Sequence, residues 1–427
     1  MSSSRPKVAV IGTGIAGMSA AWFLRERFDV TFYEKNAVPG GHTNTVTLEE
    51  DGRAVPVDTG FMVYNEITYP LLTRFFKELG VPTKPTSMSF SVQHLPSALE
   101  YSGTGLDGLF AQRRNLLNPR FLRMLGDIDR FNRESPEVLE GDRWAGATIA
   151  EYAETKGFGR DFLDRYLVPM SSAVWSTEPG AMRRFPAVTL VRFFRNHGLL
   201  GGLSGHYTWR TVEGGSRVYR DKVLALFPGR VLLGNAACRV ARGSGLAVVE
   251  GSDGRAGVYH HAVIACHADE ALALLGTEAT ELERRLLSRF RYQRNAALLH
   301  GDASVMPKKK RAWSSWNYRI RTDGAGRESA ATVYSMNSLQ RVSEKKDYFV
   351  SINDPGDVDP SKAYWKADYD HPTYDGEAVG AQKELPRLNE GRVLAFCGSY
   401  FGYGFHEDAF RSGLEAARAV AGERFWP

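Results

Sequence analysis

Residues 7–24 read KVAVIGTGIAGMSAAWFL, and this stretch decides the fold. Residues 8–11 form an apolar, mostly β-branched run, which is typical of a strand buried on both faces of a sheet. A G-x-G-x-x-G turn follows at Gly12, Gly14 and Gly17, and residues 18–24 continue with the apolar spacing of a helix. Strand, glycine-rich turn and helix in this order predict a Rossmann-like nucleotide-binding unit.

Each glycine of the turn is expected to serve a different purpose. Gly12 permits the tight turn, Gly14 allows a pyrophosphate to approach the backbone, and Gly17 lets the helix pack closely on the strand. The first helical amides, at Ile15 and Ala16, face the phosphates together with the positive end of the helix dipole. The turn therefore predicts a dinucleotide site.

A second strand and a glycine pair come next. Residues 30–33 form another strand-like run that ends in Glu34, and a carboxylate at this position accepts hydrogen bonds from both ribose hydroxyls of an adenosine. Residues 33–43 then read YEKNAVPGGHT. Two adjacent glycines let the backbone pass where no side chain fits, which indicates that a bulky ligand lies against residues 40–41.

Six segments, in this order and spacing, resemble the flavin amine oxidase and phytoene desaturase superfamily of two-dinucleotide-binding-domain flavoproteins, and the resemblance covers most of the chain. The segments are GTGIAG at 12–17, EKNAVPGGH at 34–42, VDTGFM at 57–62, VEGGS at 212–216, AVIACH at 262–267, and FCGS with HEDAFRSG within 396–413. The resemblance implies an α/β fold (α+β overall), in which a Rossmann-like FAD domain is interleaved with a substrate domain of antiparallel sheet plus helices. It implies FAD, rather than NAD, as the cofactor.

The chain is expected to pass between the two domains more than once. Residues 1–85, 206–285 and 390–427 are assigned to the FAD-binding domain, and residues 86–205 and 286–389 to the substrate-binding domain. The first substrate segment is rich in helical patterns, whereas the second alternates strand-like runs with turns, which suits an antiparallel sheet. With 427 residues and 43% hydrophobic content, the chain can hold two domains with separate cores.

The resemblance also implies which residues contact FAD. The glycine pair passes under the pyrophosphate, the DTGFM segment approaches the ring system, and a strand that includes Val240 places backbone against the adenine. The expected FAD contacts are Gly12, Gly14, Ile15, Ala16, Gly17, Glu34, Lys35, Gly41, His42, Thr43, Gly60, Phe61, Met62, Val240, Gly398, Ser399, Glu407, Asp408 and Ala409. Two of them depart from the family pattern, because His42 stands where an arginine is usual and Ser399 stands where an acid is usual.

The C-terminal segment is expected to carry the chemistry. A helix begins there with Glu407 and Asp408 in its first turn, and the amides of Asp408 and Ala409 are expected to stabilise the charge that builds on a reduced flavin. His406 and Tyr403 are the candidate catalytic residues. His406 is either a proton carrier or a helix cap and plain flavin contact. The aromatic residues around Tyr403 form either a cage like that of amine oxidases or an apolar wall.

A narrower resemblance points to a substrate. The GGHTNT, DTGFMVYN and FGYGFHEDAF segments are similar to a bacterial branch of the superfamily that includes desaturases of methyl-branched unsaturated fatty acyl chains in furan fatty acid synthesis. This resemblance implies removal of allylic hydrogens from a methylated, phospholipid-linked acyl chain to form a conjugated methylated diene. A flavin amine oxidase and a non-redox flavoprotein isomerase are the alternatives.

Composition and spacing bear on metals and nucleic acid. Three cysteines lie far apart, and the histidines show no ligand spacing, so we expect a reducing cytoplasm and no metal site. Asp354, Asp357 and Asp359 faintly resemble a calcium loop, but the neighbouring prolines favour a plain turn. The net charge of +5 does not argue for nucleic acid.

Membrane contact is a further expectation, as is a homodimer. No apolar run approaches the about 18 residues that a membrane span needs, and no signal peptide is visible. Residues 182–200 mix apolar and basic side chains, so they are either a membrane-interface segment at the inner face of the membrane or an ordinary amphipathic segment. Residues 308–311, KKKR, are either a solvated loop or an anionic lipid contact. The expected partner is a fatty acyl lipid.

Overall fold

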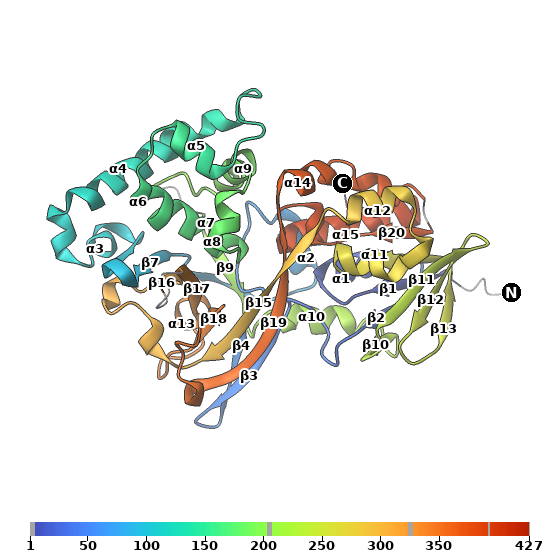
Figure 1. Cartoon of the computed structure of the whole chain (residues 1–427). Coiled ribbons are helices and arrows are strands. Elements are labelled where there is room, and N and C mark those ends of the chain that lie inside the picture. Colours follow the sequence, from blue (N-terminus) through green and yellow to red (C-terminus); the bar gives the residue numbers. More distant parts are fainter. Residues whose placement is uncertain (1–4, 203–206, 323–327, 392, 427) are drawn as a thin grey trace.

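The computed structural model describes residues 5–202, 207–322, 328–391 and 393–426. It shows two lobes side by side, one with a parallel sheet and both chain ends, the other capped by the helices of residues 105–196 (Figure 1). Between the lobes lie two long paired strands, β15 (Arg291–His300) and β19 (Ala363–Thr373).

The first lobe is built on a five-stranded sheet in the order β10-β2-β1-β14-β20, and every neighbouring pair in it is parallel. The strands are β10 (Val231–Leu233), β2 (Asp29–Glu34), β1 (Lys7–Ile11), β14 (His261–Ile264) and β20 (Leu394–Phe396). Residues 8–11 of the central strand are all buried, as their unbroken apolar run predicts.

The two faces of this sheet bury different cores. Val8 and Val10 pack among residues of α1 (Ile15–Leu24), α2 (Pro70–Glu78) and α15 (His406–Ala421). Ala9 and Ile11 pack into a second cluster, because successive side chains of a strand point to opposite faces. The first cluster also includes residues of α10 (Arg217–Leu224). The second cluster takes residues from β11 (Ala237–Gly243), β12 (Leu246–Gly251), β13 (Ala256–Tyr259), α11 (Ala268–Leu275), α12 (Glu281–Leu287) and α14 (Gly376–Gln382).

The second lobe contains a seven-stranded sheet in the order β19-β15-β18-β17-β16-β7-β8. Its pairs are antiparallel except for β16 with β7, which is parallel. The remaining strands are β7 (Phe90–His94), β8 (Leu99–Ser102), β16 (Trp316–Thr322), β17 (Glu328–Ser335) and β18 (Phe349–Ile352). Two small sheets lie beside it: β3 (Thr45–Glu50) pairs with β4 (Arg53–Asp58), and β9 (Trp209–Val212) pairs with β5 (Tyr64–Asn65) and β6 (Thr83–Thr86). The helix α13 (Met336–Gln340) follows β17.

Helices cover one side of the seven-stranded sheet (Figure 1). Val92, Tyr318 and Ile320 of the sheet share one core cluster with buried residues of the helical segment. The helices are α3 (Gly105–Leu109), α4 (Pro119–Glu134), α5 (Ile149–Thr155), α6 (Arg160–Phe162), α7 (Val168–Trp175), α8 (Pro179–Arg183) and α9 (Ala187–Asn196). The α/β fold class, with a Rossmann-like sheet and a mostly antiparallel second sheet, is thus confirmed.

The chain passes repeatedly between the lobes. The parallel sheet takes strands from residues 7–34, 231–264 and 394–396, whereas the seven-stranded sheet takes strands from residues 90–102 and 291–373. The segment expected to be rich in helices also supplies β7 and β8, two strands at the edge of the second sheet. The exact domain boundaries stay a prediction.

The apolar side chains of residues 182–200 face inward. Met182, Leu190, Phe193 and Phe194 are all buried in the helical core. Because these side chains are already packed against protein, they are not available to enter a lipid bilayer, and the amphipathic interpretation describes this segment. Among the described residues, no helix combines the length and the apolar character needed to cross a membrane.

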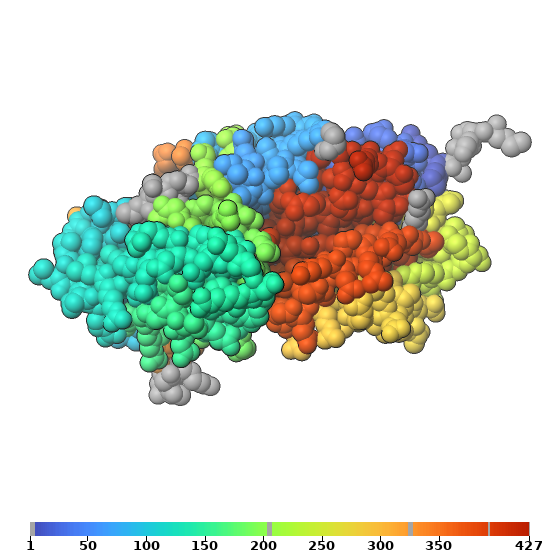
Figure 2. All heavy atoms as spheres, turned by 90° about the horizontal axis from the view of Figure 1, so that it is seen from above, coloured from blue at the N-terminus to red at the C-terminus, as the bar shows by residue number. Residues whose placement is uncertain are grey.

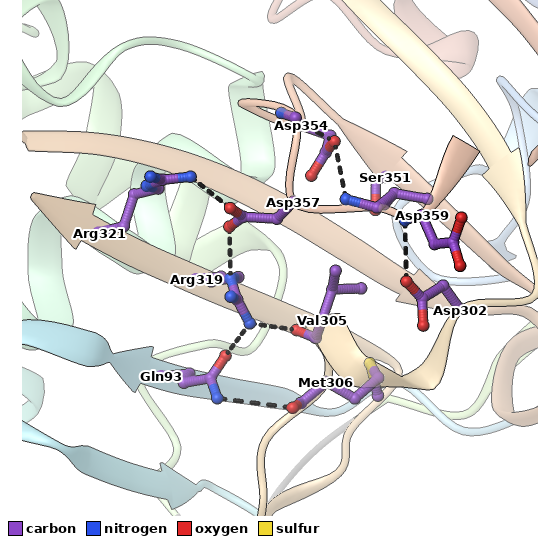
Figure 3. A network of polar contacts seen from close by, with 12 residues as sticks. Gln93, Asp302, Val305, Met306, Arg319, Arg321, Ser351, Asp354, Asp357 and Asp359 are labelled. Carbon is purple, nitrogen blue, oxygen red and sulfur yellow. Dashed lines mark hydrogen bonds and ion pairs between the residues drawn. The ribbon is translucent and has the colours of Figure 1, made fainter. Parts of the chain in front are cut away.

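The aspartates of residues 354–359 are engaged in protein contacts (Figure 3). Asp357 pairs with Arg319, at 3.1 Å from its Nε, and with Arg321, both on β16. Asp354 accepts a hydrogen bond from the amide of Gly356, and Asp359 accepts one from the amide of Ser361. These contacts hold the loop after β18 against the sheet, in agreement with the interpretation as a turn.

Candidate active site

One cavity of about 1250 Å³ spans both lobes. In the first lobe it is bounded by the β1–α1 turn, the ends of β2 and β14, and the first turn of α15; in the second it reaches between the helices. Sixteen of the residues expected to bind FAD or to act in catalysis line it: Gly12, Gly14, Ile15, Ala16, Glu34, Lys35, Gly41, His42, Gly60, Phe61, Met62, Gly398, Ser399, Tyr403, His406 and Ala409.

The three glycines of the turn differ in the space around them. Gly12 has φ +102°, which favours glycine, and a Cβ there would lie 2.8 Å from the carbonyl oxygen of Ala265. A Cβ on Gly17 would lie 2.1 Å from the carbonyl oxygen of Gly12, so Gly17 serves close packing and does not line the cavity. A Cβ on Gly14 would meet nothing within 4 Å. Gly14 alone borders open space, as expected for a pyrophosphate position.

Glu34 ends β2 at the cavity wall. One oxygen of its carboxylate accepts hydrogen bonds from the amide of Thr13, at 3.1 Å, and from the Thr13 hydroxyl; the other accepts from the amide of Asn36, at 2.9 Å. The carboxylate therefore fixes the β1–α1 turn relative to β2, and Glu34 lines the cavity. Lys35, beside it, pairs with Glu270 of α11.

The glycine pair lies against the first turn. Gly40 and Gly41 have φ of +112° and +57°, and the nearest atom to a Cβ on Gly41 would be the Cα of Gly14, 3.7 Å away. The two backbone segments thus border the same part of the cavity. Next to the pair, Gly60 approaches so closely that its Cβ would lie 2.2 Å from the carbonyl oxygen of His42.

His42 is surrounded by rings. Its ring lies 4.8 Å from that of Tyr369 and 5.0 Å from that of His371, both on β19. Burial holds the pKa of His42 well below its usual range, so the ring is neutral. His42 cannot replace the positive charge of the arginine that the family pattern leads one to expect.

His406 begins α15 and stacks on Phe61, with ring centroids 3.8 Å apart. Its Nε2 lies 3.1 Å from the hydroxyl of Tyr219 and 3.4 Å from that of Thr43. Burial lowers the pKa of His406 to about 3. A histidine this weakly basic is neutral at physiological pH, which favours the contact role over the proton carrier. Thr43 itself is buried behind His406 and does not line the cavity.

Of the next residues of this helix, Ala409 lines the cavity, whereas the side chains of Glu407 and Asp408 are engaged by protein amides. The Glu407 carboxylate accepts hydrogen bonds from the amides of Leu71 and Leu72, at 3.1 and 3.0 Å, and so caps α2. Asp408 accepts from the amides of Tyr403 and Phe405. The amide of Ala409 donates to the carbonyl of Phe405. It is not free to stabilise a ligand, so that part of the expectation is corrected.

Val240 also differs from its expected place. It is buried in β11 within the core and does not line the cavity. The preceding residues of the same segment, 236–238, line the cavity instead. The cavity is thus lined by an earlier part of this segment than Val240, and the adenine contact stays a prediction.

The aromatic residues near Tyr403 pack as a wall. Phe405 stacks on Phe193 of α9, with centroids 5.0 Å apart and planes 20° apart, while Tyr400 and Phe401 are tilted by 48° to each other. The indole nitrogen of Trp175 donates to the carbonyl of Tyr403. The stacked pair therefore joins the loop to the helical layer, and the apolar wall describes it better than a cage.

Several lining residues were not foreseen. They include Ala265, Cys266 and His267, which follow β14, and Trp175, Phe193, Tyr369, His371 and Tyr374. The first three follow a recognised buried strand, and the carboxyl ends of parallel strands are where ligands bind in such sheets. Nothing in the local pattern marks the others.

The residues present fit FAD. The backbones of Gly14 and Gly41 border the same part of the cavity, a Cβ on Gly14 would meet nothing within 4 Å, and Glu34 stands at the end of the second strand. Three buried polar atoms of lining residues, His42 Nε2, Tyr374 Oη and Tyr400 Oη, have no hydrogen-bond partner within the described parts of the chain. Buried polar atoms are normally satisfied, so a bound polar group is expected beside them. Among the described residues, no group of three or more His, Cys, Asp or Glu is arranged to hold a metal ion.

Comparisons with known sequences agree with this geometry. The family model for flavin containing amine oxidoreductase matches residues 15–304. A curated relative, the carotenoid phi-ring synthase of Streptomyces griseus, is 36% identical over 112 residues. That stretch spans 25% of the chain and only 20% of the relative.

Solved structures share the fold across nearly the whole chain. Cyclohexylamine oxidase from Brevibacterium oxydans IH-35A superimposes with a TM-score of 0.68 at 16% identity, covering 98% of this chain and 99% of that one. The CLA-producing fatty acid isomerase from P. acnes superimposes with a TM-score of 0.65 at 12% identity, covering 96% and 97%. Identities this low carry the architecture and not the activity.

Proposed function

We propose a function from one premise: the chain belongs to the family of flavin containing amine oxidoreductases, whose model matches residues 15–304. It is an FAD-dependent oxidoreductase, so the superfamily, cofactor and enzyme class expected from the sequence are confirmed. Within this class, we infer that it desaturates a methylated unsaturated fatty acyl chain carried by a phospholipid. The product is a conjugated methylated diene of the kind required in furan fatty acid synthesis.

The observation that carries this proposal is the shape of the cavity. The cavity continues from the expected nucleotide site at the β1–α1 turn into the helical layer, where α3, α4 and α7 line it. The apolar side chains at that end are Leu109, Leu125, Ile128, Met170 and Val174. A long apolar chain would gain burial along this wall, whereas a small polar substrate would leave it unfilled.

The charged groups at the cavity wall argue against a cationic substrate. Asp129, Glu270 and Asp368 each pair with a basic side chain of the protein. Asp370 is exposed on β19. An amine entering the cavity would therefore have to compete with existing ion pairs for Asp129, Glu270 and Asp368.

The chemistry suits a water-poor site. Bound FAD supplies the two-electron acceptor for a hydride that is removed from the acyl chain of the substrate. An allylic position is the favourable donor, because the positive charge that develops there is delocalised and stabilised by the methyl group. The cation then has to release a proton from the adjacent carbon to solvent to complete the diene. Phe193, Phe405 and Trp175 line this part of the cavity, and His406 stays neutral beside it. Two similar proteins, a fatty acid isomerase and a carotenoid phi-ring synthase, are also named for apolar molecules.

The decisive test mixes the flavin-loaded enzyme, without oxygen, with a methylated monounsaturated phospholipid. We expect the flavin absorbance to bleach and mass spectrometry to find a lipid lacking two hydrogens. Cyclohexylamine and putrescine should cause no bleaching. Bleaching by an amine alone would favour an amine oxidase. A lipid of unchanged mass with a shifted double bond would favour an isomerase, and either result would overturn the proposal.

A cavity-filling variant tests the substrate channel separately. Val174→Trp places a bulky ring in the apolar end, so kcat/KM for long acyl chains should fall about tenfold or more, with a smaller loss for short chains. Val258→Trp, at an exposed position on β13, is the matched control and should leave both unchanged. Equal losses for short and long chains would show that the acyl chain does not occupy this end.

A further inference from the structure

Exposed leucines gather at one end of the molecule. Four of the ten large apolar side chains that are exposed among the described residues fall in one short stretch, and they are Leu106, Leu116, Leu117 and Leu122. Leu117 is the extreme case, with 90% of its surface accessible. They lie on α3, on the 3-10 helix Arg113–Leu117 and on α4, and we call these four residues the leucine surface. Single exposed leucines are ordinary, but four on adjacent elements mark a contact site.

The leucine surface lies at the tip of the molecule. Figure 1 shows α3 and α4 at the end of the helical lobe remote from the parallel sheet, and Figure 2 shows the corresponding cyan residues projecting there. Each of the four side chains keeps between 44% and 90% of its surface accessible. The surface is therefore free to meet another body without a rearrangement of the fold.

The same helices wall the proposed substrate cavity. Leu109 of α3, and Leu125 and Ile128 of α4, line its apolar end. Thr104, just before α3, and Asp129 of α4 also line it and are exposed, so the cavity reaches the surface here. One pair of helices thus turns apolar residues both into the cavity and out to solvent. An apolar molecule that leaves the leucine surface would therefore have only a short distance to travel to the cavity entrance.

Basic residues surround the leucine surface. Arg114 and Arg123 flank the leucines in sequence, and the exposed run Lys308–Lys309–Lys310 adjoins α3, because Arg311 lies 3.5 Å from Asp107 of that helix. Within the described ranges, no carboxylate pairs with any of these five cations. Three further arginines pair with two aspartates: Arg113 and Arg311 with Asp107, and Arg120 with Asp161. The rim therefore carries an excess of positive charge.

We propose that the leucine surface and its basic rim dock on an anionic lipid bilayer, with the cavity entrance facing the membrane. Leucines entering the headgroup region and cations meeting lipid phosphates are the two components of interfacial binding. A protein partner would also cover leucines, but it would not explain why an apolar cavity opens beside them. The proposal rests on the proposed acyl-lipid function, because docking would bring the cavity to its lipid substrate. The docking site lies away from residues 182–200.

Vesicle sedimentation with the flavin-loaded protein tests this. Vesicles of dimyristoyl lipids contain no double bond, so binding is measured without turnover, and docking and desaturation can fail independently. We expect binding to phosphatidylglycerol-containing vesicles, weak binding to pure phosphatidylcholine, and a loss of binding as salt screens the basic rim. Lack of binding to the anionic vesicles would overturn the proposal.

Matched variants locate the surface. The double variant Leu116→Asp, Leu117→Asp should reduce the vesicle association constant about tenfold or more, because two apolar side chains no longer enter the interface. Leu226→Asp with Leu233→Asp, exposed leucines in the other lobe, should leave it unchanged. Lys308→Glu with Lys309→Glu should abolish only the preference for anionic lipid. Flavin content and thermal midpoint verify that each variant is folded.

Two results would reassign the surface. If both leucine pairs affected vesicle binding equally, the contact would be unspecific and the proposal wrong. If analytical ultracentrifugation found a dimer that Leu116→Asp, Leu117→Asp dissociates, while vesicle binding stayed as in the natural sequence, the leucines would join two copies of the chain instead.

Discussion

At the scale of single residues, Gly14 offers the sharpest test of the cofactor site. Gly14 has φ −63° and ψ 173°, a conformation open to any residue, and a Cβ there meets nothing within 4 Å. Gly14→Val should therefore fold, with a change in unfolding free energy of the flavin-free protein of about 1 kcal/mol or less. Its side chain would project into the cavity and should abolish FAD binding, measured as flavin content after purification.

Gly17 provides the contrast. A Cβ at Gly17 would lie 2.1 Å from the carbonyl oxygen of Gly12, so Gly17→Val should prevent α1 from packing on β1 and leave little soluble protein. If Gly14→Val retained FAD, or if both variants behaved alike, the assignment of Gly14 to the pyrophosphate position would be wrong.

His406 is expected to contribute contact and not proton transfer. Burial lowers its pKa to about 3, and its ring stacks on Phe61. His406→Gln should keep FAD and slow flavin reduction less than about tenfold, whereas loss of a general acid or base costs about 10²–10⁴-fold. Stopped-flow reduction at several pH values would measure this. A larger loss, or an inflection near pH 6 that the variant removes, would restore the proton carrier.

Residue-level expectations succeeded where chemistry is local. Gly14 and Glu34 could be placed because a turn and the end of the next strand determine their neighbours. Tyr369 and His371 could not, since β19 brings them beside His42 from more than three hundred positions along the chain. Val240 lies in the core and not at the cavity, and strand periodicity does not say at which residue a strand meets a cavity.

At the scale of elements, Glu407 links two helices. Its buried carboxylate satisfies the amides of Leu71 and Leu72 at the start of α2, although it belongs to α15. Glu407→Ala would leave both amides without a partner, so the unfolding free energy should fall by about 1–3 kcal/mol. Glu415→Ala, exposed on the same helix, should change it by less than about 0.5 kcal/mol. Denaturant titration followed by circular dichroism measures both.

The capping role of Glu407 shows a limit of sequence reasoning about elements. An acid in the first turn of a helix is normally interpreted through the dipole of its own helix. Here the carboxylate serves a different helix, and only the tertiary fold reveals it. If Glu407→Ala were as stable as Glu415→Ala, water would have to satisfy the amides of α2, and the proposed link between the helices would be unimportant.

At the scale of the whole molecule, order along the sequence was predictable and the cavity was not. Six short segments sufficed to indicate an interleaved flavoprotein, because each marks a backbone close to the nucleotide. The apolar end of the cavity comes from α3, α4 and α7, whose patterns are those of ordinary amphipathic helices. Neither an inward-facing cavity wall nor an outward-facing leucine surface can be recognised until the helices are placed on the sheet.

Buried histidines are expected to determine the acid stability of the flavin-free protein. Burial lowers the pKa of His197, His300 and His371 to about 4 and that of His406 to about 3. Between these values and the ordinary pKa of about 6.5, the unfolded chain binds more protons than the folded one, so the unfolding free energy falls as the pH falls. From pH 7 to pH 5, each histidine contributes a loss of about 2 kcal/mol.

Buried carboxyls act in the opposite direction. Burial raises the pKa of Asp58 and Asp408 to about 6, so the folded state binds the extra proton and gains about 1 kcal/mol per group over the same interval. Burial raises the pKa of Glu407 as well. The four histidines outweigh these carboxyls, so the flavin-free protein should lose several kcal/mol of stability between pH 7 and pH 5. His300→Gln should reduce that slope by about 2 kcal/mol, whereas His260→Gln, at an exposed position, should not. Urea titrations at each pH measure the slope, and a stability that rises toward pH 5 would show that the carboxyls dominate and that these histidines are not held neutral.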